Sequence, residues 1–130
     1  MKKIEIDTFL KFRFLSNPHF SPDGTKIAFT VSVPDRETNG YLSDLYLYDL
    51  GKKTVSRVTC GGDAKIWSWT AENTLIFPAA RTAALKKGKE NGTSFFYEIS
   101  PSGGEASCRA SVPASVTGIR LLPDGRYLLT

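Results

Sequence analysis

A base for nucleophilic chemistry is scarce in this sequence, and the one histidine lies close to a serine and an aspartate. His19 is the single histidine, and Ser21 and Asp23 follow it within four residues. Serine, histidine and aspartate form nucleophilic triads in which the imidazole takes the proton of the hydroxyl. Adjacency in sequence is not that geometry, and the Pro-Asp-Gly at 22–24 indicates a tight turn with a simpler role for the aspartate. We therefore expect no catalytic role for these residues.

The remaining acids and thiols suggest no second centre. Asp44 and Asp49 flank a strand-like stretch five residues apart, so their side chains point to opposite faces and do not form an acid–base pair. Cys60 and Cys108 match no zinc or redox spacing, and we expect both to be reduced and buried as small apolar residues. The sequence thus predicts no catalytic, cofactor-binding or metal-binding residue.

Two local clusters each allow a binding and a structural interpretation. Lys86-Lys87-Gly88-Lys89 is expected to be a solvated loop tip, with contact to phosphate or nucleic acid as the alternative. Trp67 and Trp69 share one face of a predicted strand, where they form either a stacking platform for a ligand or part of the core. The net charge of +4 is spread thinly and no apolar stretch approaches a membrane span, so we expect neither nucleic acid nor membrane as a partner.

The elements that would position these residues follow a repeat of about fifty residues. The Pro-Asp-Gly that contains Asp23 recurs at Asp124, and a degenerate copy surrounds Glu72, so the spacings are 49 and 52 residues. A second element, at 47–50, recurs at 96–99 with the same 49-residue period. Two independent elements sharing one period predict a repeat architecture.

Each copy contains turn residues between short runs rich in β-branched and aromatic side chains, which predicts four antiparallel strands per repeat. The strands are expected at 26–33, 44–50, 54–60, 64–69, 74–80, 94–100, 106–112 and 116–121. Polar loops are expected at 34–40 and 81–93. Four-stranded sheets at this period are blades of a β-propeller, with an all-β sandwich as the alternative.

The predicted fold class is therefore all-β, with about two and a half blades of an incomplete propeller. Residues 1–16 form an N-terminal leader, 17–63 the first blade, 64–115 the second, and 116–130 the truncated first half of a third. Within the leader, Asp7 is expected to cap a short helix that runs to Leu15 and docks on the propeller's rim, although an extended leader fits the pattern equally.

The stretch at 17–29, with 44–50 about twenty residues later, resembles the opening blade of TolB-like propellers. Together with the leader at 6–16, it is similar to the N-terminus of bacterial enzymes of the prolyl oligopeptidase family, in the acylaminoacyl-peptidase and dipeptidyl-peptidase branch. The resemblance implies a propeller that scaffolds and gates access of short peptides to a C-terminal α/β-hydrolase domain. It leaves open the peptide specificity and the total number of blades.

The catalytic half of such an enzyme is not found among these residues. No Gly-x-Ser-x-Gly elbow occurs; the string at 92–96 has its serine one place late, and His19 precedes nearly every serine. We expect a non-catalytic, cofactor-free and cytoplasmic piece, whose partners are the remaining blades and the hydrolase domain, and which self-associates when isolated. The alternatives are a fragment of a TolB-like interaction propeller without peptidase activity, and a self-contained all-β binding domain.

Overall fold

The computed structural model describes residue 5, residues 8–79 and residues 83–130, and most of their regular structure is β-strand. The strands are β1 (Phe14–Phe20), β2 (Lys26–Asp35), β3 (Gly40–Asp49), β4 (Thr54–Arg57), β5 (Ser68–Trp69), β6 (Leu75–Pro78), β7 (Ser94–Ile99), β8 (Ser107–Val112), β9 (Ile119–Leu121) and β10 (Tyr127–Leu129). The helical elements are the 3₁₀-helix η1 (Thr8–Lys11) and the α-helix α1 (Ala83–Glu90). Each predicted strand is present in the described part of the chain, with ends that shift by up to four residues.

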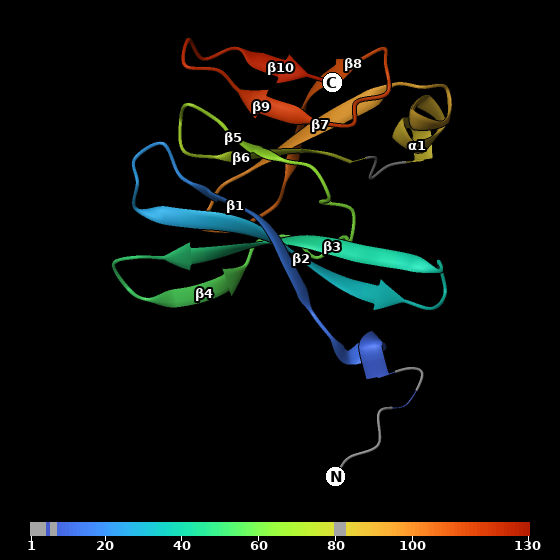
Figure 1. Ribbon diagram of the computed structural model, residues 1–130. Coiled ribbons are helices and arrows are strands. Elements are labelled where there is room, and N and C mark those ends of the chain that lie inside the picture. Colours follow the sequence, from blue (N-terminus) through green and yellow to red (C-terminus); the bar gives the residue numbers. More distant parts are fainter. Residues whose placement is uncertain (1–4, 6–7, 80–82) are drawn as a thin grey trace. The chain divides into compact units, whose positions relative to one another are not determined.

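The strands form two compact units, each built on a four-stranded antiparallel sheet (Figure 1). The first unit holds the chain up to Phe20 together with Thr25–Lys65, and its sheet has the order β1-β2-β3-β4. The second unit holds Ser21–Gly24 and Ile66–Thr130, with the sheet β5-β6-β7-β8 and the pair β9-β10. Strands that are neighbours in the sequence are neighbours in each sheet, which is the meander predicted for a propeller blade.

In the first sheet, one face holds most of the buried apolar side chains and the other is more open. Ala28 pairs with Leu47, and Thr30 pairs with Leu45, so these four buried residues share one face. Their neighbours in the strands point the other way, because the side chains of a strand alternate between faces. The Leu-Tyr alternation of β3 therefore places the leucines in the core and Tyr46 on the opposite face.

The core of the second unit is larger and aromatic. Phe77 pairs with Tyr97 across β6 and β7, and their stacked rings lie 6.3 Å apart between centroids. Trp67 and Trp69 are both buried and meet edge to face at 6.5 Å. Aromatic pairs in these geometries add stability beyond the area that they bury.

The three repeated turns have the same backbone geometry although their residues differ. Gly24, Asn73 and Gly125 occupy the same place, with φ angles of +72°, +61° and +86°. The amide of each donates to the carbonyl three residues earlier, at 2.9, 3.2 and 3.0 Å respectively. Asparagine is one of the few residues that tolerates this left-handed conformation, so the degenerate copy keeps the turn without glycine.

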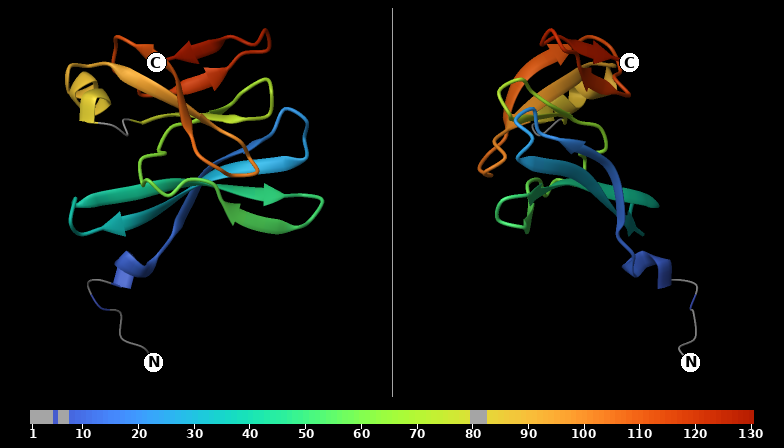
Figure 2. Two further views of the ribbon diagram at one scale, coloured as in Figure 1. Left: turned by 180° about the vertical axis from the view of Figure 1, so that it is seen from behind. Right: turned by 60° about the vertical axis from the view of Figure 1, so that its left-hand side comes forward.

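Two predictions about local structure differ from the observed fold. The helix expected up to Leu15 is limited to the single 3₁₀ turn η1, which packs on β2, and Leu15 lies in β1. Its expected cap, Asp7, lies outside the described residues. This stretch alternates Phe12 and Phe14 with basic residues, a period-2 pattern typical of a strand, and pairing with β2 begins at Phe14. The loop expected at 81–93 contains α1, which lies beside β7 in both views of Figure 2.

Helix α1 is positioned by a close contact with β7. A Cβ at Gly88 would lie 2.7 Å from Cζ of Phe95, so only glycine allows the helix this near the ring. Lys87 and Lys89 lie in its last turn, where cations interact favourably with the helix dipole. In the part of the chain that the structure describes, none of the helices is long and apolar enough to span a membrane.

Candidate functional site

The residues that suggested a triad lie around the turn after β1. His19 is in β1 and pairs with Ala28, and the Oγ of the buried Ser21 donates to Oδ1 of Asp23 at 2.5 Å. Because a hydroxyl has one proton, this hydrogen bond directs it to the carboxylate and away from an imidazole base. Within the second unit, the Asp23 amide donates to Oδ1 of Asn73 at 3.0 Å. These contacts fix the turn and do not activate Ser21.

Asp44 is the most strongly bound acid in the described residues of the first unit. Its side chain is 7% exposed, and Oδ2 accepts from Nη2 of Arg57 at 2.7 Å. Oδ1 accepts from Oγ1 of Thr59 at 2.8 Å and from the Gly62 amide at 3.0 Å. Burying a carboxylate is costly unless it is paired and hydrogen-bonded, and here both oxygens have donors.

The same cluster ties the chain after β4 to β3. Thr59 Oγ1 accepts from the Leu45 amide at 3.0 Å, and Arg57 Nε donates to the Thr59 carbonyl at 2.9 Å. The hydrogen bond from Arg57 to Asp44 raises the pKa of the guanidinium above its usual range. Asp44 is therefore a structural anchor inside β3, where the sequence suggested a charge at a strand end.

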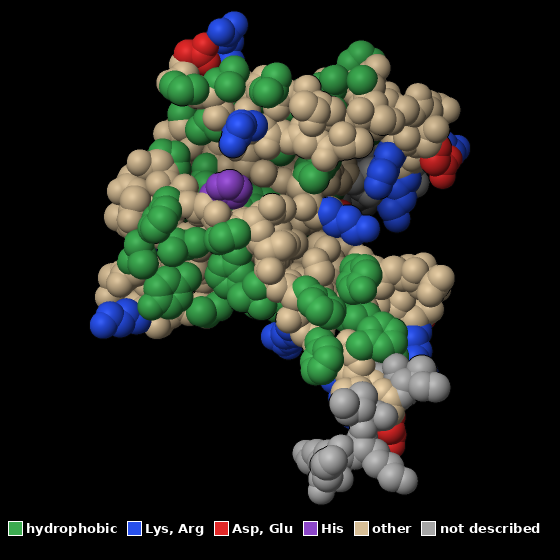
Figure 3. Space-filling model, viewed as in Figure 1, with side chains coloured by type: hydrophobic (Ala, Val, Ile, Leu, Met, Phe, Trp, Pro, Cys, Tyr) green, Lys and Arg blue, Asp and Glu red, His purple; other side chains and the backbone are tan. Residues whose placement is uncertain are grey.

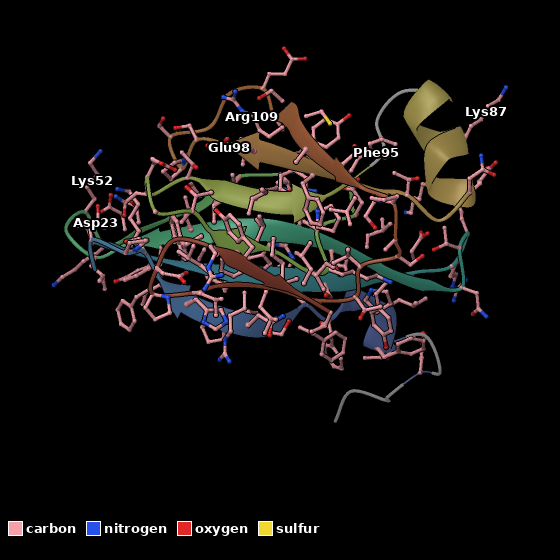
Figure 4. The ribbon with its side chains drawn as sticks, turned by 90° about the horizontal axis from the view of Figure 1, so that it is seen from above. Asp23, Lys52, Lys87, Phe95, Glu98 and Arg109 are labelled. Atoms are coloured by element: carbon pink, nitrogen blue, oxygen red, sulfur yellow. The ribbon has the colours of Figure 1, made fainter. Side chains whose placement is uncertain are left out.

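Asp49 and Glu98, which the sequence repeat aligns, make different contacts. Oδ1 of Asp49 accepts from the amides of Gly51 and Lys52, both at 3.0 Å, and the Lys52 hydrogen bond lowers the pKa of this carboxyl. Glu98 Oε2 pairs with Nε of Arg109 at 3.0 Å, and the two residues lie side by side in Figure 4. Neither carboxylate is paired with a second acid.

In the described part of the chain, the surroundings of the remaining candidate residues do not form a binding or catalytic site. Trp67 and Trp69 are buried, so they do not present a stacking platform. The prediction that the cysteines are buried is wrong, since Cys60, in the chain after β4, and Cys108, in the edge strand β8, are both exposed free thiols. Lys87 points away from β7 in Figure 4, on a helix where the sequence predicted a loop tip. Among residues 5, 8–79 and 83–130, no group of three or more His, Cys, Asp and Glu side chains could hold a metal ion.

The feature of the first unit most suited to a function is the open face of its sheet, which we call the aromatic face. Its residues lie on all four strands, and in register Phe20 is beside Ile27, Ile27 beside Tyr48, and Tyr48 beside Val55. Further apolar residues of the face are Leu15, Pro18, Phe29, Tyr46 and the buried Val31.

Large apolar side chains of this face remain uncovered. Leu15 is 67% exposed and Phe20 64% exposed, and a shallow cavity of about 340 Å³ lies between β1 and β4 with an almost wholly apolar lining. Figure 3 shows hydrophobic side chains gathered over this part of the first sheet. Contiguous exposed apolar surface on one sheet face is typical of a surface that another element covers.

The sequence contained a signal for this face. A strand that is buried on one side alternates apolar and polar residues, whereas a strand that is buried on both sides is apolar throughout. Residues 45–48 read Leu-Tyr-Leu-Tyr, with no charged residue on either face. The pattern therefore fits a sheet that lies between two others.

Comparison with known proteins supports this interpretation of the sheet. No family model matches the chain. The chain is 27% identical over 133 residues to the "Uncharacterized peptidase YuxL" of Bacillus subtilis (strain 168), a match that covers 99% of this chain and 19% of that protein. The chain thus spans about a fifth of the length of this curated relative.

Solved structures show the same fold. The β-propeller domain of the Trilobed protease from Pyrococcus furiosus, described as having an open velcro topology, matches with a TM-score of 0.63 and 16% identity over 94% of this chain and 35% of that one. Pyrococcus horikoshii acylaminoacyl peptidase matches with a TM-score of 0.68 and 18% identity over 95% of this chain and 18% of that one. The β-propeller fold class is confirmed, as is the resemblance to the propeller segments of peptidases.

Proposed function

We propose that this chain is the N-terminal part of the β-propeller of a serine peptidase of the prolyl oligopeptidase family, with TolB-like repeats. The observation that carries the proposal is the aromatic face, an apolar face on a sheet that already has its four strands. In a propeller such a face is covered by a neighbouring blade of the same protein. The likeness to peptidase propellers in both sequence and fold supports this parentage.

In this proposal the chain is a scaffold that controls which peptides reach a hydrolase domain elsewhere in the protein, and that domain hydrolyses them. The propeller admits short peptides to that domain and excludes longer ones. Acylaminoacyl and dipeptidyl substrates are the two classes that fit the resemblance. A cytoplasmic location is part of the proposal, and it is supported by the two exposed free thiols, which persist in a reducing compartment.

The first experiment tests the chemistry. The full-length protein is expected to hydrolyse an acyl-peptide or aminoacyl arylamide and to react with a fluorophosphonate at one serine. The 130-residue chain alone is expected to do neither. A full-length protein that does not react with the fluorophosphonate would favour the alternative, an interaction propeller of TolB type without peptidase activity.

The second experiment tests the aromatic face. Val55 and Ser56 are exposed neighbours on β4 whose side chains point to opposite faces of the sheet. In the full-length protein, Val55→Lys is expected to raise the hydrolysis of long peptides relative to a short arylamide, because it disturbs the blade that covers the face. Ser56→Lys is the matched control and should leave the ratio unchanged.

The isolated chain offers a further measurement on the same variants. We expect it to self-associate through the aromatic face, because exposed apolar surface of this kind favours association. Sedimentation velocity should show oligomers for the unmodified chain and for Ser56→Lys, and a smaller species for Val55→Lys. A monomeric, cooperatively unfolding unmodified chain would favour a self-contained binding domain.

A further inference from the structure

The first unit contains a pocket that has no role in the proposed control of peptide access. It has a volume of about 410 Å³, within the range of small-molecule sites, and lies on the core side of the first sheet. Phe14 and Ser16 of β1 line it, as do Thr30 and Ser32 of β2. We call it the hydroxyl pocket, and its other lining residues come from β3 and from the chain after β4.

Hydroxyl groups replace apolar side chains on this part of the sheet face. Ser32 lies between Phe14 and Ser43 in register, and the two serine hydroxyls are 2.8 Å apart. Further along the same face the paired residues are Ala28 and Leu47, both buried and apolar. The change from apolar to hydroxyl residues produces a hydrogen-bonding surface beside a dry core.

The second repeat has an apolar residue at the position that aligns with Thr30. In β2 the lining residue Thr30 is buried, and the residue 49 positions later, after β6 in the second sheet, is the buried Ala79. The two aligned positions therefore differ in polarity. A few polar groups among apolar and aromatic side chains are typical of small-molecule sites.

Lys65 supplies the only charged side chain among the residues that line this pocket. The chain before it is held against β3, because the Ser43 amide donates to the Gly62 carbonyl at 3.0 Å and the Ala64 amide donates to the Ser43 carbonyl at 2.9 Å. The Gly62 amide in turn donates to Asp44. The buried anchor described above therefore positions the cation at the pocket.

An aromatic wall completes the pocket. Phe14 and Tyr41 meet edge to face, with ring centroids 6.0 Å apart and an interplanar angle of 81°. Both rings are partly exposed, so an apolar group of a ligand can pack on them. The pocket thus combines one cation, several hydroxyls and an aromatic surface.

We propose that the hydroxyl pocket binds a small organic carboxylate that carries an aromatic or apolar group. The carboxylate pairs with Lys65, the serine and threonine hydroxyls bind its polar atoms, and its apolar group packs on Phe14 and Tyr41. The pocket contains no acidic side chain among its lining residues, which favours an anion over a cation. This site is independent of peptidase chemistry and does not rest on it.

The test uses the full-length protein with any reactive serine first blocked by a fluorophosphonate. N-acetyl-L-phenylalanine and its uncharged amide are titrated by calorimetry into the wild type, Lys65→Met and Lys65→Arg. Lys52→Met is the matched control, because Lys52 is an exposed lysine outside the pocket. Ser32→Val removes one hydroxyl of the pocket and introduces a β-branched residue that is suited to a strand.

The expected result is saturable binding of the carboxylate to the wild type, weakened about tenfold in Lys65→Met and retained in Lys65→Arg and Lys52→Met. The amide and Ser32→Val should also give weaker binding. The proposal is overturned if the wild type shows no saturable binding, if the amide binds as tightly as the acid, or if Lys65→Met and Lys52→Met bind alike. Arylamide hydrolysis by the unblocked Lys65→Met variant reports the proposed function separately.

Discussion

Replacing Asp44 by alanine is predicted to be among the most destabilising single changes in the first unit. The substitution removes a buried carboxylate that accepts hydrogen bonds from Arg57, Thr59 and Gly62. It leaves the Thr59 hydroxyl and the Gly62 amide without this acceptor. The chain after β4 then loses its attachment to β3.

The magnitude follows from how exposed each partner is. The Thr59 hydroxyl is buried and costs about 1–3 kcal/mol when it is left unsatisfied, whereas the Gly62 amide is only partly buried and costs about 1 kcal/mol. Arg57 is 52% exposed, so water replaces its lost partner and the ion pair contributes about 1 kcal/mol or less. The sum for Asp44→Ala is about 2–5 kcal/mol.

Two variants separate the buried hydrogen bonds from the ion pair. Arg57→Ala removes the half-exposed partner of Asp44 together with the hydrogen bond from Arg57 Nε to the Thr59 carbonyl, and it is expected to cost about 1 kcal/mol. Asp44→Asn keeps an oxygen that can accept from Thr59 and Gly62 but loses the ion pair, so we expect about 1–2 kcal/mol. The predicted order of destabilisation is Asp44→Ala, then Asp44→Asn, then Arg57→Ala.

The assay is urea unfolding together with amide hydrogen exchange. Asp44→Ala should lower the urea midpoint and remove most of the protection of the Gly62 and Leu45 amides, while the Tyr97 amide of the second sheet serves as the control. If Arg57→Ala destabilises as much as Asp44→Ala, the ion pair dominates and the reasoning from burial is refuted. A decrease of less than about 1 kcal/mol in the free energy of unfolding of Asp44→Ala would also refute the reasoning from burial.

Three further outcomes follow from local geometry. Gly88→Ala should not give the usual gain in helix stability of about 1 kcal/mol, because its Cβ would meet Phe95, but in a Phe95→Ala background the same change should stabilise the protein in thermal unfolding. Lys53 has a φ of +53°, so Lys53→Gly should stabilise by about 1 kcal/mol, whereas the adjacent Lys52→Gly should not; equal effects in urea unfolding would contradict this strain argument. The hydrogen bond from the Lys52 amide lowers the pKa of the Asp49 carboxyl, so the ionised carboxylate stabilises the fold above pH 3.8 and this contribution is lost as the pH falls below 3.8. The difference in unfolding free energy between wild type and Asp49→Asn should therefore shrink below pH 3.8, and a difference that stays constant there would exclude this contribution.

The sequence was sufficient to predict the meander because its information is local. Turn residues at 22–24 and 123–125 and the alternation in 44–50 each act over a few neighbours, and the observed strands follow them. The degenerate copy at Asn73 was also recognised, since asparagine can replace glycine in the left-handed position.

The anchor around Asp44 and the hydroxyl pocket could not be predicted in the same way. Asp44 meets Arg57 and Gly62 from 13 and 18 residues away, and nothing in the spacing of these residue types distinguishes them from surface charges. The pocket needs the register of three strands and the path of the chain to Lys65. Such information exists only once the sheet is paired.

Register also explains why aligned residues of the two repeats differ in environment. Tyr48 and Tyr97 are 49 residues apart and occupy the same place in the sequence repeat. In the first sheet Tyr48 pairs with Ile27, but Ile76, the residue 49 positions after Ile27, pairs with Glu98 and not with Tyr97. A shift of one residue moves a side chain to the other face of a sheet.

This difference in register changes the burial of the two aligned tyrosines and the contacts of the two aligned acids, Asp49 and Glu98. Tyr97 is 5% exposed and stacks on Phe77, whereas Tyr48 lies on the aromatic face. Glu98 lies on the face of its sheet opposite to Phe77 and Tyr97, where it pairs with Arg109. Asp49 lies on the same face of the first sheet as Leu45 and Leu47, and its carboxylate caps a turn. The connection between the second and third strands is a short hairpin in the first sheet and includes α1 in the second. Because hairpin length and turn type set register, this difference in connection accounts for two blades of one repeat presenting different faces.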